Sequence, residues 1–221
     1  VARPKQELPP GTWDTWLINA GRGWGKTRVG AETIRIWARN FPIIHLVAAT
    51  ASDARDIMVE GESGILAISP AYERPVYTPS IRRLTWSNGS KAILFSADEP
   101  DRLRGPQCYK AWADELAAWR YPDAWDQLQF GLRLGDHPQC IITTTPRPTP
   151  IIKSLMADEK THITNGSTYE NKENLAETFI RSIKAFEKSD FADDWRELMR
   201  LYLVRRTRSF IKTNYACTDN T

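Results

Sequence analysis

The segment Ala20–Thr27, with the sequence AGRGWGKT, constrains the fold of this chain more than any other feature. It matches the pattern [A/G]-x4-G-K-[S/T] of a phosphate-binding loop, which needs a strand before it and a helix after it. The flanking residues meet both needs. Thr12–Ala20 is aromatic and aliphatic, and Thr27–Phe41 carries apolar residues at helical spacing. The order strand, loop, helix favours a nucleotide site over a glycine-rich loop with a solvated lysine.

Each residue type in this loop has a chemical reason. Glycines at 21, 23 and 25 let successive backbone N–H groups and the helix N-terminus face a phosphate. Lys26 is expected to reach the β- and γ-phosphates of ATP, and Thr27 to ligate Mg²⁺. The candidate binding residues are therefore Ala20, Gly21, Arg22, Gly23, Trp24, Gly25, Lys26 and Thr27. Arg22 is also a candidate catalytic residue, because its side chain starts within reach of the nucleotide or of an adjacent subunit.

The composition excludes several classes of protein. The chain has 221 residues, of which 41% are hydrophobic and 26% charged, with a net charge of +3, and this excludes disorder, collagen and a coiled coil. No apolar run is long enough for a membrane helix, and the N-terminus has no signal-peptide core. Three cysteines without CxxC or Cys/His spacing disfavour zinc and disulfides and favour a cytosol. The three histidines are scattered, and most of the nine tryptophans are expected in the core.

Strands alternate with helices along the rest of the chain, which predicts an α/β fold with a mostly parallel central sheet flanked by helices. Asn88-Gly89 predicts a tight turn and an antiparallel hairpin between Arg83–Trp86 and Lys91–Ser96. Further strands are expected at Ile43–Ala49, Tyr109–Ala113, Gln139–Thr143 and His162–Ser167. Helices are expected at Ala54–Glu60 (capped by Ser52 or Asp53), Ala117–Leu134 (broken near Pro122), Ile151–Ala157, Leu175–Lys188 and Phe191–Leu203.

A hydrolytic phosphate loop works with a second strand that ends in an acid for the Mg²⁺ shell, followed by a glutamate that activates water. Three Asp-Glu pairs compete for this role, at 98–99, 114–115 and 158–159. The last has no strand before it and is interpreted as solvated. Asp98-Glu99 ends a hairpin strand and meets Pro100, whereas Asp114-Glu115 ends a separate strand and opens into a helix. The context favours Asp114-Glu115.

Two further groups of polar residues are candidates for catalysis and coupling. Arg102 and Arg104 lie in a loop-like stretch, where an arginine could compensate charge that develops on a transferred phosphoryl group. The alternative is a solvated loop. Thr143, Thr144 and Thr145 end a strand that is expected beside the acidic one, where hydroxyls could sense the γ-phosphate through water. The alternative is a β-branched strand end that caps its neighbours.

The segments AGRGWGKTR, EPDRLRGPQ, KAWADELAAW, IITTTPRP and STYEN together resemble the large terminase subunit of tailed double-stranded DNA bacteriophages, in order and spacing over about residues 3–203. The N-terminal half of that family is a P-loop ATPase of the additional-strand, catalytic-glutamate type. It drives viral DNA into the procapsid as a ring on the portal protein. The resemblance thus implies ATP and Mg²⁺ as cofactors, and double-stranded DNA, the portal and the small terminase subunit as partners, in the bacterial host cytoplasm.

The resemblance also implies roles for single residues. Lys26 and Thr27 match the phosphate-loop residues, Asp114 the metal ligand and Glu115 the catalytic glutamate. Residues 143–145 match the motif that couples hydrolysis to movement. The loop with Arg102 and Arg104 resembles the region that supplies an arginine to a neighbour's ATP, with the choice between the two left open. Gln6 looks like the glutamine that contacts adenine.

The sequence also departs from the family. A full-length subunit continues into a nuclease domain whose metal site uses several acidic residues, and here only Asp219 follows Glu197. Residues 204–221 no longer resemble the family. We therefore expect one ATPase domain over residues 1–203 with an incomplete start, a divergent tail over 204–221, no C-terminal nuclease domain and no DNA cleavage. A helicase-like P-loop ATPase and an inactive, truncated prophage remnant are the alternatives.

Overall fold

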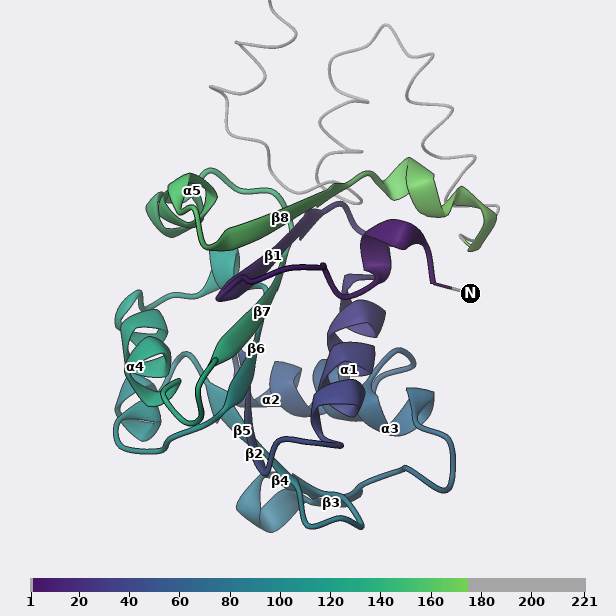
Figure 1. The fold of residues 1–221 in the computed structure, drawn as a ribbon, viewed down its shortest axis with the longest axis vertical. Coiled ribbons are helices and arrows are strands. Elements are labelled where there is room, and N and C mark those ends of the chain that lie inside the picture. Colours follow the sequence, from purple (N-terminus) through teal and green to yellow (C-terminus); the bar gives the residue numbers. More distant parts are fainter. Residues whose placement is uncertain (1, 175–221) are drawn as a thin grey trace, which may run out of the picture.

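The computed structural model describes residues 2–174 of the chain (Figure 1). Eight strands form one sheet in the order β3-β4-β5-β2-β6-β7-β1-β8. Neighbours from β5 to β8 are parallel, whereas β3, β4 and β5 pair antiparallel. The strands are β1 Thr15–Ala20, β2 Ile43–Ala48, β3 Val76–Thr78, β4 Arg83–Thr85, β5 Lys91–Ser96, β6 Lys110–Asp114, β7 Gln139–Thr144 and β8 Thr161–Gly166. The predicted α/β fold, its mostly parallel sheet and its antiparallel hairpin are confirmed.

Helices cover both faces of this sheet (Figure 1). The α-helices are α1 Lys26–Trp37, α2 Ala51–Asp53, α3 Ile65–Ile68, α4 Asp123–Gly131 and α5 Pro150–Ala157. A π-helical segment, η2, spans Ala54–Val59. Short 3-10 turns occupy η1 Pro4–Gln6, η3 Pro79–Ile81, η4 Pro100–Leu103, η5 Leu116–Ala118 and η6 Thr168–Asn174.

The period-two alternation of each strand divides the core into two layers. In β1, Trp16, Ile18 and Ala20 belong to the cluster that contains α1 and α3, whereas Leu17 belongs to the cluster that contains α4 and α5. Trp13, Trp16, Trp37 and Trp112 are buried as expected, and Trp125 is partly buried against the second layer. Each fully buried large apolar side chain stabilises the fold by about 1.5–3 kcal/mol.

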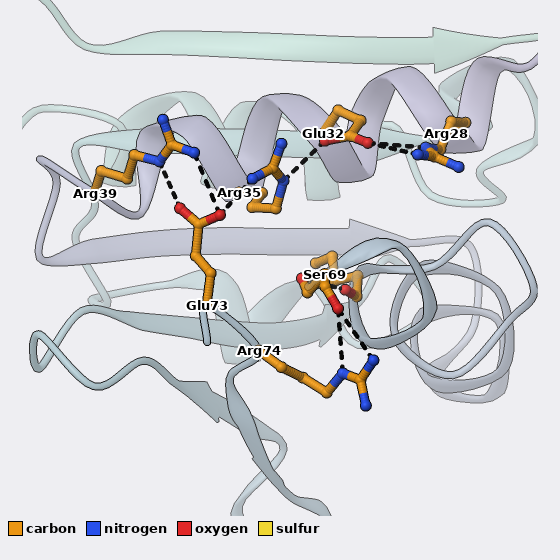
Figure 2. A network of polar contacts seen from close by, with 8 residues as sticks. Arg28, Glu32, Arg35, Arg39, Ser69, Glu73 and Arg74 are labelled. Carbon is orange, nitrogen blue, oxygen red and sulfur yellow. Dashed lines mark hydrogen bonds and ion pairs between the residues drawn. The ribbon is translucent and has the colours of Figure 1, made fainter. Parts of the chain in front are cut away.

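The solvent side of α1 carries a chain of ion pairs (Figure 2). Arg28 and Arg35 both contact Glu32 on the same helix, at 2.8 Å. Arg35 and Arg39 then converge on Glu73, which lies in the connection between α3 and β3. The helix that follows the phosphate loop is therefore fixed to the sheet by its apolar face and to the α3–β3 connection by its charges.

The helix predicted after β2 is present, as η2 over Ala54–Val59, but its predicted cap and start were wrong. Neither Ser52 nor Asp53 caps it: Thr50 is the N-cap, in extended backbone, and its Oγ1 accepts a hydrogen bond from the Asp53 N–H at 3.1 Å. The helix therefore begins at Ala51, three residues earlier than expected, because Thr50 follows the end of β2 in the geometry an N-cap requires. The break near Pro122 is confirmed, since α4 begins at Asp123.

Several predictions lie outside the described residues. These are the two helices at Leu175–Lys188 and Phe191–Leu203, the tail over 204–221, and Cys217. Cys108 and Cys140 are buried free thiols, and burial raises the pKa of Cys108 to about 12. Within residues 2–174, the helices are all too short or too polar to cross a membrane.

Candidate active site

The predicted phosphate loop, residues 20–27, joins the end of β1 to the start of α1. Gly25 is the N-cap of α1 and has φ +100°, a left-handed backbone that favours glycine. The glycine before the lysine is therefore required by the turn from strand to helix. The N-terminus of this helix of 12 residues attracts anions, because its first N–H groups lack partners within the helix.

Lys26 is buried at the base of this loop, with 8% of its surface exposed. Its Nζ donates to the carbonyl oxygens of Ala20 at 3.0 Å and of Gly21 at 3.2 Å, and lies 3.7 Å from Glu115 Oε1. Burial lowers the pKa of Lys26, and the carboxylates of Glu115 and Asp114 act in the opposite direction. Thr27, next in α1, is partly buried.

Asp114 is the last residue of β6 and is buried. Its Oδ1 accepts a hydrogen bond from Thr143 Oγ1 at 2.6 Å, and Thr143 Oγ1 in turn accepts one from Trp112 Nε1 at 2.7 Å. Burial raises the pKa of Asp114 to about 7, although the Thr143 hydroxyl favours the charged form. A nearby cation would restore the ionised carboxylate.

Glu115 follows in a left-handed backbone conformation, with φ +48° and ψ +44°. Such a conformation is uncommon for a residue with a side chain, and Arg82 is the other described non-glycine residue that adopts it. Its N–H donates to the Thr143 carbonyl at 2.6 Å, which ties the turn to β7. Its carboxylate accepts hydrogen bonds from the Thr145 backbone N–H at 3.1 Å and the Thr145 hydroxyl at 2.8 Å.

The three threonines each have a different partner. Thr143 contacts Asp114, Thr145 contacts Glu115, and Thr144 Oγ1 accepts from the backbone N–H of Ala117 at 3.2 Å. This arrangement follows from the strand order, because β7 lies between β1 and β6 and pairs Thr143 with Asp114. The carboxyl ends of these three parallel strands thus bring together the loop, the acidic pair and the threonines that were predicted from the sequence.

The other Asp-Glu pairs lie elsewhere. Glu99 pairs with Arg82 at 3.1 Å and with Arg102 at 3.2 Å, beyond the end of β5. Asp158 follows α5, and its carboxylate accepts from the Lys160 N–H in a local turn. Neither pair contacts the phosphate loop through any hydrogen bond or ion pair found among residues 2–174.

The candidate arginines differ in their surroundings. Arg22 is exposed on the phosphate loop. Arg102 and Arg104 are both exposed at η4, but Arg102 is held by Glu99, whereas Arg104 has no ion-pair partner within the part of the chain that the structure describes. Gln6 lies against the loop, where its Nε2 donates to the Trp24 carbonyl at 3.1 Å and its Oε1 accepts from the Arg3 N–H.

Sequence reasoning missed the contacts that hold the loop from outside. Glu170 and Asn171, just after β8, bond to Trp24 and Gly23 respectively. Their signal was the STYEN stretch, which follows a predicted strand and had no role assigned to it.

The sequence model of the family described as terminase large subunit, T4likevirus-type, N-terminal, matches residues 17–213. The chain belongs to this large terminase family. No curated protein matches the chain. Among solved structures, the large terminase ATPase domain of Thermus phage P74-26 is 14% identical with a TM-score of 0.61, and the match covers 87% of this chain and 88% of that one.

The large terminase of a thermophilic bacteriophage, solved in several crystal forms, has a similar fold. One crystal form is 15% identical with a TM-score of 0.64, over 86% of this chain and 48% of that chain, so the chain spans about half the length of that terminase. A second form, in complex with ATP-gamma-S, is 16% identical with a TM-score of 0.61, over 81% of this chain and 45% of the other. At such low identity, these matches show the fold of this chain and nothing more.

Proposed function

We propose that this chain is the ATPase motor domain of a phage large terminase, over residues 1–203, and that it hydrolyses ATP to drive viral double-stranded DNA into the procapsid. The observation that carries the proposal is the meeting of Lys26, Asp114 and Glu115 at the carboxyl edge of a parallel sheet. Lys26 Nζ lies 3.7 Å from Glu115, and Asp114 is the preceding residue. Ligands of open α/β sheets bind at this edge.

The oxygen donors of the site fit a magnesium nucleotide. The hydroxyl of Thr27 and the carboxylate of Asp114 are the hard oxygen donors that Mg²⁺ takes together with phosphates. The ion would neutralise charge on the phosphate oxygens. The backbone of Ala20–Thr27 receives the phosphates, and Gln6 is the proposed contact to adenine.

Glu115 is the proposed general base. Its carboxylate accepts hydrogen bonds from Thr145 and lies 3.7 Å from Lys26 Nζ. Phosphate binding draws Lys26 from the carbonyls of Ala20 and Gly21 toward the nucleotide, and the Glu115 carboxylate then orients a water and takes its proton. Because Thr143 and Thr145 are bonded to the acidic pair, the end of β7 is the proposed element that passes this change onward.

An arginine from a neighbouring subunit completes the site in this proposal. Arg104 is the better candidate, because Arg102 is already paired with Glu99, whereas Arg104 is exposed and without an ion pair among residues 2–174. Arg22 contributes from the subunit's own loop. The chain then acts as a homo-oligomeric ring in the host cytoplasm, with the portal protein and the small terminase subunit as partners.

The test is the rate of ATP turnover per subunit over a range of protein concentrations, with and without double-stranded DNA. Turnover that rises with concentration and is lost in Glu115→Gln supports an assembling ATPase, and Glu159→Gln, an exposed acid beyond α5, is the matched control. DNA strand separation would instead support a helicase-like enzyme. Failure of the wild-type chain to bind MgATP would contradict the proposal and favour an inactive remnant.

A further inference from the structure

The stretch after β8 contacts the phosphate loop at three positions. We call residues Thr168, Glu170 and Asn171 the β8 clamp. Asn171 Nδ2 donates to the Gly23 carbonyl at 2.6 Å, and Trp24 Nε1 donates to Glu170 Oε2 at 3.2 Å. Thr168 packs on Gly21, where a Cβ would lie 2.4 Å from the threonine Oγ1. The loop and the clamp come from opposite ends of the described chain, so the folded structure alone brings them together.

Trp24 is the anchor of this contact. It occupies a position at which the phosphate-loop pattern accepts any residue, yet its side chain is fully buried. Its indole N–H donates to a carboxylate oxygen of Glu170, and such a charge-assisted hydrogen bond is stronger than a neutral one. Glu170 is fixed in turn by Lys5 Nζ at 3.0 Å and by the Ser167 N–H at 3.2 Å.

The loop is also held by the N-terminal segment. Arg3 and Gln6 both donate to the Trp24 carbonyl, and the Arg3 guanidinium lies 5.0 Å from the centre of the Trp24 ring. Lys5 joins the two segments, because it belongs to the N-terminal turn η1 and bonds to Glu170. Trp24 is therefore enclosed by two segments, neither of which touches Lys26 through a hydrogen bond in the part of the chain that is described.

We propose that Glu170 and Asn171 are positioning residues for nucleotide binding, which hold the phosphate loop in its binding conformation through Trp24 and Gly23. The inference rests on the proposed function. A loop with glycines at 21, 23 and 25 has large conformational freedom. Ordering this loop when phosphate binds costs conformational entropy, and this cost is avoided where the folded protein already holds the loop in place. The clamp lies outside the catalytic cluster, so it acts on affinity for the nucleotide phosphates and leaves the chemical step unchanged.

The test combines nucleotide affinity with exchange of the loop amides. Glu170→Ala and Trp24→Phe, which keeps an aromatic ring and removes the N–H, are each expected to raise the Kd for MgADP by about tenfold, the effect of one charge-assisted hydrogen bond. The double variant should bind MgADP with a Kd no higher than that of the weaker-binding single variant. Glu170→Gln should restore most of the affinity, because an amide oxygen still accepts from Trp24, and Glu159→Ala is the matched control. In Glu170→Ala, the kcat at saturating ATP should stay within about twofold of the wild-type value.

Hydrogen exchange of residues 20–26 in the nucleotide-free protein separates this inference from the proposed function. The clamp predicts faster exchange there in Glu170→Ala and Trp24→Phe, with exchange in β2 and β6 unchanged, which also reports that the variants fold. Unchanged exchange at 20–26 together with an unchanged Kd would overturn it. If the wild-type chain does not bind MgADP, the proposed function fails, and the exchange comparison still decides whether the clamp holds the loop.

Discussion

At the scale of single residues, Thr145 tests whether the pose of Glu115 sets the rate of hydrolysis. Thr145→Val keeps the shape and the backbone N–H but removes the hydroxyl that lies 2.8 Å from Glu115 Oε1. We expect turnover to fall about tenfold with an unchanged Kd for MgADP, because one hydrogen bond to a charged group is lost away from the phosphates. Steady-state kinetics and calorimetry measure both. Thr85→Val in β4 is the control, and an equal loss in both variants would argue against a specific role.

His45 makes a prediction about pH. It is buried in β2 against Phe95, its Nε2 has no partner within the described residues, and burial lowers its pKa from 6.5 to about 4. The unfolded chain therefore takes up a proton below about pH 6.5 that the folded chain takes up only near pH 4. Its contribution to stability is complete above about pH 6.5 and falls by up to roughly 3 kcal/mol as the pH drops to about 4. Denaturant titrations at about pH 7 and pH 4.5 should show a smaller difference in His45→Leu than in wild type. An identical difference in the two proteins would show that the pKa of His45 is the same in the folded and the unfolded chain.

At the scale of elements, the ion pairs on α1 predict how that helix is attached. Glu73 accepts from both Arg35 and Arg39, and its side chain is only 15% exposed (Figure 2). Glu73→Gln leaves two arginines without their shared acid, and we expect a loss of about 1–2 kcal/mol in the free energy of unfolding, smaller at high salt. Chemical denaturation at low salt and at about 1 M salt measures it. Glu62→Gln, an exposed acid before α3, is the control and should change stability by less than about 0.5 kcal/mol.

The helices and strands also show which parts of the fold can be predicted from sequence patterns. The strands next to the site were predictable, because runs such as Ile43–Ala48 are nearly continuously apolar and buried on both faces. The positions of the loop and of the acidic pair at the carboxyl ends of β1 and β6 were predictable from the strands that precede them. β3, with three residues at the sheet edge, and α3, with four, carry too few residues for a period to appear. The Thr50 cap and the Glu170–Trp24 bond depend on where distant segments meet, which a local pattern does not encode.

At the scale of the whole molecule, the edge of the sheet supplies every proposed catalytic group except an arginine from a neighbour. A subunit of a ring gives its arginine to one neighbour and receives one from the other, a head-to-tail contact. Arg104, exposed and without an ion pair in residues 2–174, is free for that contact, and Arg102 is not. Arg104→Ala should therefore abolish turnover at concentrations where wild type is active, and Arg102→Ala should leave most of it.

Mixing two inactive variants tests this arrangement directly. Arg104→Ala subunits retain Glu115, and Glu115→Gln subunits retain Arg104, so a site between one of each is complete. In an equal mixture, chance association makes about a quarter of the sites complete, and turnover should recover to about that fraction of wild type if the sites act independently. ATP turnover measured against the mixing ratio should peak near equal amounts. A mixture that shows only the sum of its parents would mean that Arg104 serves its own subunit's site or none. That outcome would not change the proposed roles of the phosphate loop and Glu115. It would mean that the active site of this chain gives no reason to expect a ring.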